Sequence, residues 1–262
     1  MNRIHILAVL ACMVIEPLAP GPAAAGERVE ALRDSSGAVF RLLLAMPEQP
    51  RGVIVMLPGG TGDIGIERDG GIRRGNNFVV RTRDLWLARG YGVLIPDTIA
   101  HASLRGIRST PHYAAIVGDL AALARERSPG PVFLLGTSQG SIAAMNGAAH
   151  LGPGLITGVV MTESVSRMGG SEETVFDAAP DRVRVPALIV ANDRDACPVS
   201  PPEDADRIAA AMSASPSVEV LRVSGGETGS KTCGSLSPHG YLGIETNVVS
   251  RITTWMAHVP HL

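Results

Sequence analysis

Short, almost wholly apolar runs alternate along this chain with longer segments of helical period, and this alternation restricts the fold more than any other feature. The clearest runs are residues 52–57 and 131–135, each too short for a helix and each bounded by turn residues. A run without polar alternation predicts a strand buried on both faces, as in a parallel sheet. Further strands are expected at 91–95, 156–161, 187–190 and 218–223, and helices at 77–89, 110–127, 138–150, 202–212 and 241–256. Strands alternating with helices predict an α/β fold with a mostly parallel central sheet and helices on both faces.

The segment ahead of these runs has a different pattern. Residues 27–33 and 38–46 flank the turn sequence Asp-Ser-Ser-Gly at 34–37, which predicts a β-hairpin. No internal repeat or linker divides residues 26–262, so a single domain is expected. The polar connection at 162–184 is too short for a large lid domain.

Residues 1–25 have the pattern of a secretory signal peptide. Arg3 precedes an apolar run at 4–15, and the segment ends in three alanines at 23–25. The run is shorter than the ~20 residues that a transmembrane helix needs. We therefore expect export to the periplasm or the medium, with no membrane span. The alternatives are a buried N-terminal helix, or a lipoprotein attached through Cys12, because residues 9–12 loosely resemble a lipobox.

Removal of the signal leaves two cysteines, Cys197 and Cys233. Exported proteins mature in an oxidising compartment, so a disulfide between them is expected. The alternative is a pair of free buried thiols, which pack as small apolar side chains.

Charge and aromatic content argue against some binding functions. The formal net charge is −2 and aromatic residues make up 3% of the chain. Neither a basic stripe nor an acidic tail is present, so nucleic acid is not an expected partner.

The strongest chemical signal is Gly-Thr-Ser-Gln-Gly at 136–140, between an apolar strand and a helix of small residues. This is the G-x-S-x-G pattern in the strand–turn–helix context that makes it meaningful. The tight turn holds the serine in a strained conformation that raises its hydroxyl above the sheet. Ser138 is therefore the candidate nucleophile, the alternative being a glycine-rich turn without chemistry.

A serine hydroxyl needs a base to take its proton. The candidate is His239, in the turn between the last strand and the last helix, where its alternative role is to cap that helix. In this motif the base follows the serine in the chain, and a loop at the carboxyl edge of the sheet suits it. The remaining histidines lie in the signal, ahead of the serine, at the end of the helix after it, or near a C-terminus expected to fray: His5, His101, His112, His150, His258 and His261.

The base in turn needs a carboxylate to orient it. The strand at 187–190 leads into a loop that carries Asp193 and Asp195. Asp195 is preferred because it lies farther into the loop, whereas Asp193 lies nearer the strand end and is expected to bond loop amides or pair with Arg194. Glu163, after the preceding strand, is the third candidate.

From Arg51 to Met256 the chain resembles an α/β-hydrolase. The resemblance rests on the 136–140 motif, Asp195, His239, their order along the chain, and the Leu-Pro-Gly-Gly-Thr turn at 57–61. Many relatives have His-Gly in that turn, and here Pro58 stands in place of the histidine. By resemblance, the oxyanion hole would take one backbone amide from Gly60 or Thr61 and another from Gln139.

The resemblance implies a serine hydrolase that cleaves a small-molecule or polymeric carboxylic ester, with no metal or organic cofactor. A cofactor-free haloperoxidase or perhydrolase would use the same triad, and a non-catalytic binding protein of this fold is the other alternative. His101 and Arg105 are candidates for the substrate pocket or for a solvated loop. Residues 63–77 form either a binding loop or a mobile one.

Overall fold

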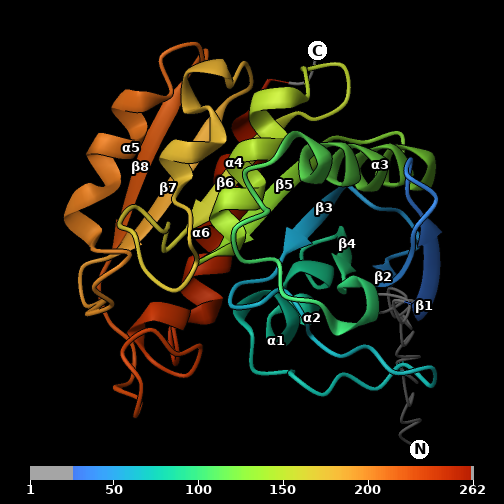
Figure 1. Ribbon diagram of the computed structural model, residues 1–262, viewed down its shortest axis with the longest axis horizontal. Coiled ribbons are helices and arrows are strands. Elements are labelled where there is room, and N and C mark those ends of the chain that lie inside the picture. The colour runs from blue at the N-terminus through green and yellow to red at the C-terminus, as the bar shows by residue number, and fades with distance from the viewer. Residues whose placement is uncertain (1–25, 261–262) are drawn as a thin grey trace, which may run out of the picture.

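A computed structural model describes residues 26–260 of the chain (Figure 1). The predicted signal segment and His261 lie outside the described residues. The strands are β1 (Gly26–Arg33), β2 (Val39–Met46), β3 (Gly52–Leu57), β4 (Tyr91–Pro96), β5 (Val132–Thr137), β6 (Gly158–Thr162), β7 (Ala187–Asn192) and β8 (Val218–Val223).

All eight strands form one sheet in the order β1-β2-β4-β3-β5-β6-β7-β8. The predicted hairpin pairs β1 with β2 in antiparallel register, and β2 also runs antiparallel to β4. Every other pairing is parallel. The carboxyl ends of β3, β5, β6, β7 and β8 therefore meet at one edge, and the loops that leave this edge carry the candidate catalytic residues. The mostly parallel α/β sheet expected from the sequence is confirmed.

The α-helices are α1 (Phe78–Arg81), α2 (Arg83–Leu87), α3 (Pro111–Arg127), α4 (Gly140–His150), α5 (Ala205–Ala211) and α6 (Glu245–His258). Short 3₁₀ turns connect them: η1 (Ile99–His101), η2 (Val175–Ala178), η3 (Pro180–Arg182), η4 (Pro202–Asp204) and η5 (Pro238–Gly240). The connection between β6 and β7 holds only η2 and η3, so no lid domain is inserted there.

Three of the predicted helices differ from the structure: one is divided, one begins as a 3₁₀ turn and one begins later in the chain. The helix expected at 77–89 divides into α1 and α2 at Thr82, whose hydroxyl donates to the carbonyl of Phe78. The helix expected at 202–212 begins as the 3₁₀ turn η4. The last helix begins at Glu245 rather than 241, because Tyr241 (φ 59°) and Gly243 (φ 83°) adopt left-handed conformations that interrupt a right-handed helix. His258 is the last residue of α6 and does not lie in a frayed end.

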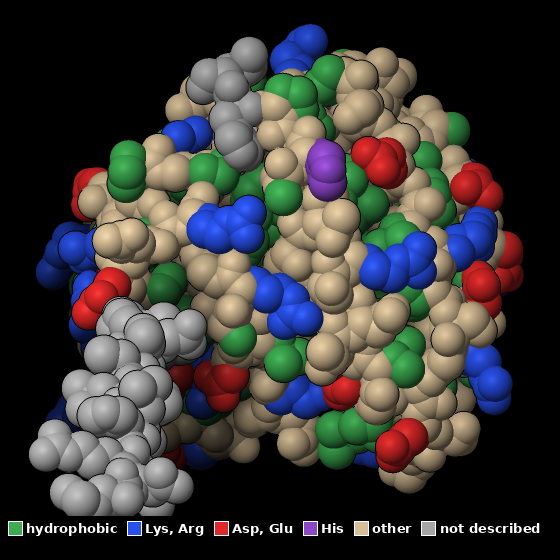
Figure 2. All heavy atoms as spheres, turned by 180° about the vertical axis from the view of Figure 1, so that it is seen from behind, with side chains coloured by type: hydrophobic (Ala, Val, Ile, Leu, Met, Phe, Trp, Pro, Cys, Tyr) green, Lys and Arg blue, Asp and Glu red, His purple; other side chains and the backbone are tan. Residues whose placement is uncertain are grey.

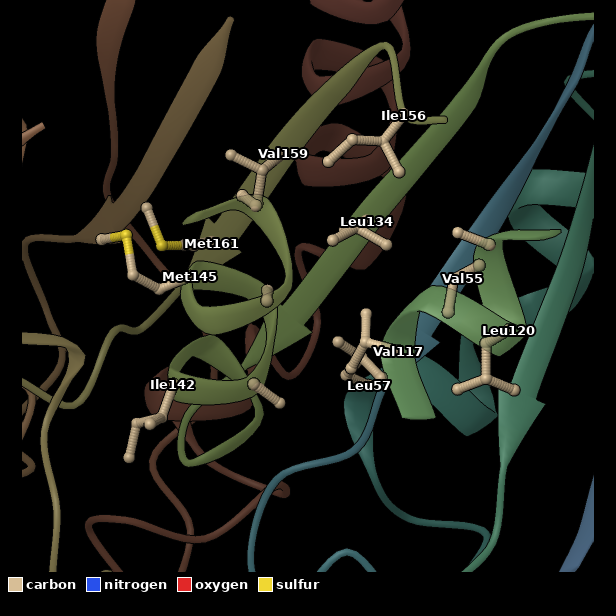
Figure 3. Close-up of a cluster of buried hydrophobic side chains, with 14 of the residues drawn as sticks. Val55, Leu57, Val117, Leu120, Leu134, Ile142, Met145, Ile156, Val159 and Met161 are labelled. Carbon is tan, nitrogen blue, oxygen red and sulfur yellow. The ribbon is translucent and has the colours of Figure 1, made fainter. Parts of the chain in front are cut away.

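The sheet is covered by helices on both faces because its central strands point apolar side chains alternately to each side. Val55 and Leu57 face the cluster that contains α3 and α4 (Figure 3), whereas Ile54 and Met56 face the cluster that contains α6. In Figure 1, α4 lies in front of β5 and β6, and α6 passes behind them. Each buried aliphatic side chain contributes roughly 1.5–3 kcal/mol to this core.

Figure 2 shows basic and acidic side chains on the same face of the molecule, seen from behind. Among residues 26–260, no helix combines the length and the apolar character that crossing a bilayer requires.

Candidate active site

The turn between β5 and α4 holds Ser138 at a φ of 52°, a left-handed value that is strained for a residue other than glycine. The turn is so tight that a Cβ at Gly136 would collide with the carbonyl group of Gly140. A Cβ at Gly140 would collide with the carbonyl oxygen of Leu57. The two glycines of the motif are therefore required by close backbone approach. The serine amide donates to the carbonyl of Thr162 on β6 (2.9 Å), which fixes the turn against the sheet.

Three side chains from three separate loops form one hydrogen-bonded chain. Ser138 Oγ lies 2.9 Å from Nε2 of His239, and Nδ1 of His239 lies 2.7 Å from Oδ2 of Asp195. The carboxylate can only accept a hydrogen bond, so Nδ1 carries the proton and Nε2 is left as an acceptor for the serine hydroxyl. This is the arrangement that a general base for Ser138 requires.

The two acids of the β7 loop have different surroundings. Asp195 is buried, and its Oδ1 accepts the amide of Cys197 (2.8 Å) while Oδ2 also accepts the hydroxyl of Ser200 (3.1 Å). The Asp193 side chain is 49% exposed and lies 3.6 Å from Arg222. The sequence predicts that Asp193 bonds loop amides or pairs with Arg194, whereas in the structure its ion-pair partner is Arg222. The reason is that β8 runs beside β7 and brings Arg222 to the start of this loop.

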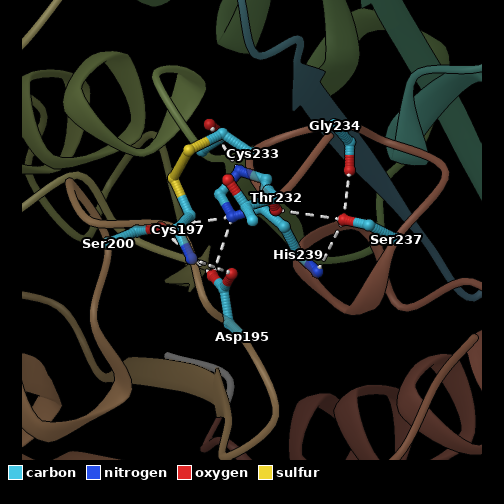
Figure 4. The surroundings of a disulfide bond; sticks show 9 residues. Asp195, Cys197, Ser200, Thr232, Cys233, Gly234, Ser237 and His239 are labelled. Carbon is cyan, nitrogen blue, oxygen red and sulfur yellow. Dashed lines mark hydrogen bonds and ion pairs between the residues drawn. A yellow bond between two sulfur atoms is a disulfide. The ribbon is translucent and has the colours of Figure 1, made fainter. Parts of the chain in front are cut away.

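His239 lies in η5, ahead of α6, and does not cap that helix. Its amide donates to Oγ of Ser237 (3.2 Å), and the Ser237 hydroxyl in turn lies within bonding distance of the carbonyls of Thr232 and Gly234 (Figure 4). The side-chain amide of Asn192, the last residue of β7, donates to the carbonyl of Pro238 (2.9 Å). Asn192 therefore links the strand that carries the acid to the turn that carries the base.

Cys197 and Cys233 form a disulfide in the structure (Figure 4). Cys197 is two residues beyond Asp195 and bonds its carboxylate through the backbone, and Cys233 belongs to the loop that Ser237 holds. The bond thus joins the loop of the acid to the loop of the base. Such covalent support suits a site whose geometry must hold within about half an ångström.

We expect reduction of this disulfide to lower activity before the protein unfolds globally, because the acid and base loops lose their common tether. The bond closes a loop with a sequence separation of 36 residues. In the entropic account, such a loop stabilises the fold by about 3–4 kcal/mol. Activity and melting temperature should be followed against reductant concentration.

The control is a Cys197→Ser/Cys233→Ser double variant, whose activity should not respond to reductant. Two alkylatable thiols in natively purified protein would contradict the prediction.

The turn after β3 lies against the nucleophile. A Cβ at Gly59 would stand 2.9 Å from the carbonyl oxygen of Thr137 and 3.1 Å from Cβ of Ser138, so only glycine allows this approach. Gly60 and Thr61 line the cavity above Ser138, and Gly60 has a φ of 60°. Gln139 is the N-cap residue of α4, directly after the serine. All three predicted oxyanion residues are thus brought to the neighbourhood of Ser138.

Sequence reasoning missed Arg108, whose side chain is fully buried behind this turn. Nη2 donates to the carbonyl of Gly60 (2.8 Å), and Nη1 lies 3.5 Å from Oε1 of Gln139. The amides of Arg108 and Ser109 donate to the carboxylate of Glu173. Arg108 therefore holds the Gly60 turn and contacts the side chain of Gln139, and an arginine in a loop gave no signal of this in the sequence.

A cavity of about 480 Å³ opens over Ser138 and His239. Most of the side chains around it are polar, and Ile64 and Phe78 are the large apolar ones. The lining residues are Gly59, Gly60, Thr61, Asp63, Ile64, Arg73, Arg74, Asn76, Asn77, Phe78, Thr137, Ser138, Cys233, Ser235, His239 and Gly240. Neither His101 nor Arg105 is among them.

The loop at 63–77 forms one wall of this cavity. The carboxylate of Asp97, beyond β4, accepts the amides of Ile64 (3.0 Å) and Ile66 (2.7 Å) and so holds the start of the loop. Within the loop, Asp63 lies 3.1 Å from His101 and pairs with Arg74. Burial raises the pKa of Asp63, but the His101 hydrogen bond and the Arg74 charge outweigh burial and lower it.

Two clusters have the composition of a metal site, Asp63 with Asp97 and His101, and Glu163 with Asp195 and His239. In the first, Asp97 accepts backbone amides, and Asp63 contacts Arg74 and His101. In the second, His239 and Asp195 are bonded to each other. A cation held by all three donors of the second cluster would have to compete with the contact between His239 and Asp195.

No protein-family model matches the sequence, and no curated protein matches it. Solved structures do match. A dienelactone hydrolase from Anabaena variabilis is 14% identical with a TM-score of 0.62, over 90% of this chain and 98% of that one. Est1E from Butyrivibrio proteoclasticus, with ferulic acid bound, is 15% identical with a TM-score of 0.61, over 87% and 98%. An esterase from Pyrococcus furiosus is 11% identical with a TM-score of 0.65, over 90% and 92%. This chain therefore has the α/β-hydrolase fold, as its sequence resemblance predicts.

Proposed function

We propose that this protein is a serine hydrolase that cleaves carboxylic esters through an acyl-enzyme intermediate. The observation that carries the proposal is the bonded chain from Ser138 through His239 to Asp195, which ends at the floor of an open cavity. The esterases among the structural neighbours support ester over amide chemistry by analogy of fold.

In this mechanism Ser138 Oγ attacks the ester carbonyl while Nε2 of His239 takes its proton. Asp195 stabilises the positive charge of the protonated imidazole, which then gives that proton to the leaving alkoxide. Water then attacks the acyl-enzyme while Nε2 of His239 takes its proton. The imidazole returns that proton to Ser138 Oγ as the carboxylic acid leaves. The amides of Gln139 and of Gly60 or Thr61 would hold the oxyanion, where one donor is typically worth about 3 kcal/mol.

The polar lining of the cavity favours short or polar acyl groups. We expect kcat/KM to be highest on p-nitrophenyl acetate or butyrate and to fall for longer chains, because only Ile64 and Phe78 offer large apolar contact. A series of p-nitrophenyl esters of increasing chain length, assayed on the protein lacking residues 1–25, tests this. A steady rise of kcat/KM up to long acyl chains would contradict the predicted preference.

The same series tests the function itself. No turnover of any ester would favour the non-catalytic binding protein, and halogenation that requires peroxide would favour the haloperoxidase or perhydrolase alternative. Both assays should be run beside each other because acyl-ester turnover alone does not separate a hydrolase from a perhydrolase.

We also place this activity outside the cytoplasm. The signal-like sequence at 1–25 and the disulfide between Cys197 and Cys233 support that location, since disulfides persist in oxidising compartments.

A further inference from the structure

A second buried acid lies beside the acid of the triad. Glu163 directly follows β6, and its residue exposure is 1%. Its φ is 46°, a strained left-handed value that turns the chain at the carboxyl edge of the sheet. One oxygen, Oε1, accepts the amide of Asn192 (2.9 Å). The other, Oε2, is buried and has no hydrogen-bond partner among the described residues.

The surroundings of Glu163 do not favour a second negative charge. A carboxylate oxygen of Glu163, one of Asp195 and a ring nitrogen of His239 all lie within 4.8 Å of one another. The other titratable group that faces it is Tyr241, whose hydroxyl donates to the carbonyl of Val190 (3.2 Å). Two buried carboxylates at such a distance do not both ionise, because each raises the cost of charging the other.

The hydrogen bonds decide which of the two acids is charged. Asp195 accepts from the Cys197 amide, the Ser200 hydroxyl and the His239 ring, whereas Glu163 accepts from one amide. Donors stabilise the ionised form, so the charge belongs on Asp195. Burial, and then the charge on Asp195, raise the pKa of Glu163 well above its usual range. The Asn192 amide and the nearby Tyr241 hydroxyl act in the opposite direction and are outweighed.

A proton on Glu163 also accounts for the oxygen without a partner. Two ionised carboxylates offer only acceptors to each other, so Oε2 lacks a partner as long as Glu163 is charged. Once protonated, Glu163 can donate a hydrogen bond, and the carboxylate of Asp195, which has an oxygen within 4.8 Å of a Glu163 oxygen, is the acceptor on that side.

We propose that Glu163 is a positioning residue that stays protonated at neutral pH and donates a hydrogen bond to Asp195. The inference deepens the proposed function, on which it rests, by adding a fourth member behind the triad. Glu163 would act through Asp195 alone: it keeps a single negative charge next to His239 and holds the carboxylate in the orientation that the imidazole needs.

Glu163→Gln is the decisive variant because the amide group can make both contacts without a proton. Its carbonyl can accept from Asn192 and its NH₂ can donate to Asp195. An unfolded glutamic acid has an ordinary pKa of about 4.5, so above that pH the folded protein holds a proton that the unfolded chain releases. Wild-type stability should therefore fall as pH rises from about 5 toward the raised folded pKa, and the glutamine variant should lack this loss.

The experiment measures melting temperature from pH 5 to pH 8, and kcat and KM on p-nitrophenyl acetate, for wild type, Glu163→Gln and Glu163→Ala. We expect the melting temperature of the glutamine variant to exceed that of wild type by a margin that grows with pH. Its kcat should stay within about threefold of wild type. The alanine variant should lose about tenfold or more in kcat with little change in KM, the loss typically seen when the hydrogen-bond partner behind a metal-ligating histidine or carboxylate is removed.

Asp193→Asn is the matched control, because it makes the same change of acid to amide on an exposed side chain of the neighbouring β7 loop. The difference in melting temperature between Asp193→Asn and wild type should not grow with pH. Two results would overturn the inference. One is a melting-temperature difference between Glu163→Gln and wild type that does not change with pH, and the other is a Glu163→Gln variant as inactive as Glu163→Ala.

Carbon-13 NMR on wild type labelled at the glutamate carboxyl carbons tests the same point without a variant. One glutamate should keep the chemical shift of a protonated carboxyl at pH 7, and ordinary titration of every glutamate would overturn the inference. Both the stability and the NMR measurements are independent of turnover. A failure of the esterase proposal would therefore be visible separately, as absent ester hydrolysis beside an intact pH signature.

Discussion

Replacement of Ser138 by alanine is expected to abolish ester hydrolysis, with a loss of kcat on the order of a millionfold. The physical reason is that no acyl-enzyme can form without the serine oxygen, and that triad members act as a unit. His239→Ala should lose about as much, because Oγ at 2.9 Å from Nε2 then has no base to take its proton. The measurements are kcat on the best p-nitrophenyl ester and covalent labelling by a fluorophosphonate probe, which should map to Ser138.

Ser141→Ala is the matched control for the serine variant. Its hydroxyl donates to the carbonyl of Ser138 (2.6 Å) but does not line the cavity, so labelling should persist in it. Labelling that survives in the Ser138 variant, or that maps to another residue, would contradict the assignment of the nucleophile.

Asp195→Asn is expected to lower kcat by about 10⁴-fold while the fold stays intact. An asparagine that keeps its carbonyl oxygen on the Cys197 amide places its NH₂ group at the position that faces Nδ1, and so favours the imidazole tautomer whose Nε2 carries the proton and cannot accept the serine proton. Kinetics should be measured together with the melting temperature, so that loss of catalysis is separated from loss of structure.

Asp193→Asn serves as the comparison, because this acid precedes Asp195 by two positions and pairs with Arg222 near the surface. Its effect should be small and should fall on stability, since exposed ion pairs typically contribute 0–1 kcal/mol. The opposite ranking of the two variants would move the triad acid to Asp193.

The local parts of the site were accessible from the sequence because each depends on a short-range rule. The glycines around Ser138 follow from steric crowding within one turn, and the order of serine, acid and base follows from where loops leave a parallel sheet. Asp195 was preferred over Asp193 on its place in the loop. The structure adds a physical basis, since only Asp195 is both buried and bonded to His239.

The supporting residues gave no such signal. Arg108 acts on the carbonyl of Gly60, 48 positions away, and Glu173 accepts from the Arg108 backbone, 65 positions away. Ser200 is an ordinary loop serine until the fold places its hydroxyl on Asp195. Their roles depend on which loops meet at the sheet edge, and composition and period carry no information about that meeting.

The sequence by itself determined the alternating elements, the turn of the candidate nucleophile and the residue types of the candidate triad, because apolar period, glycine sterics and motif spacing act over a few residues. Only the tertiary structure decided how the acid is held and which acid stands behind it. Asp195 and His239 are 44 positions apart, and Ser138 and His239 are 101 apart. Glu163 was a third candidate for the triad acid, and the fold instead seats it beside Asp195. The reason is that charge and hydrogen bonding between buried groups depend on distances in space, which are set when β5, β6 and β7 pair and bring their carboxyl ends to one edge.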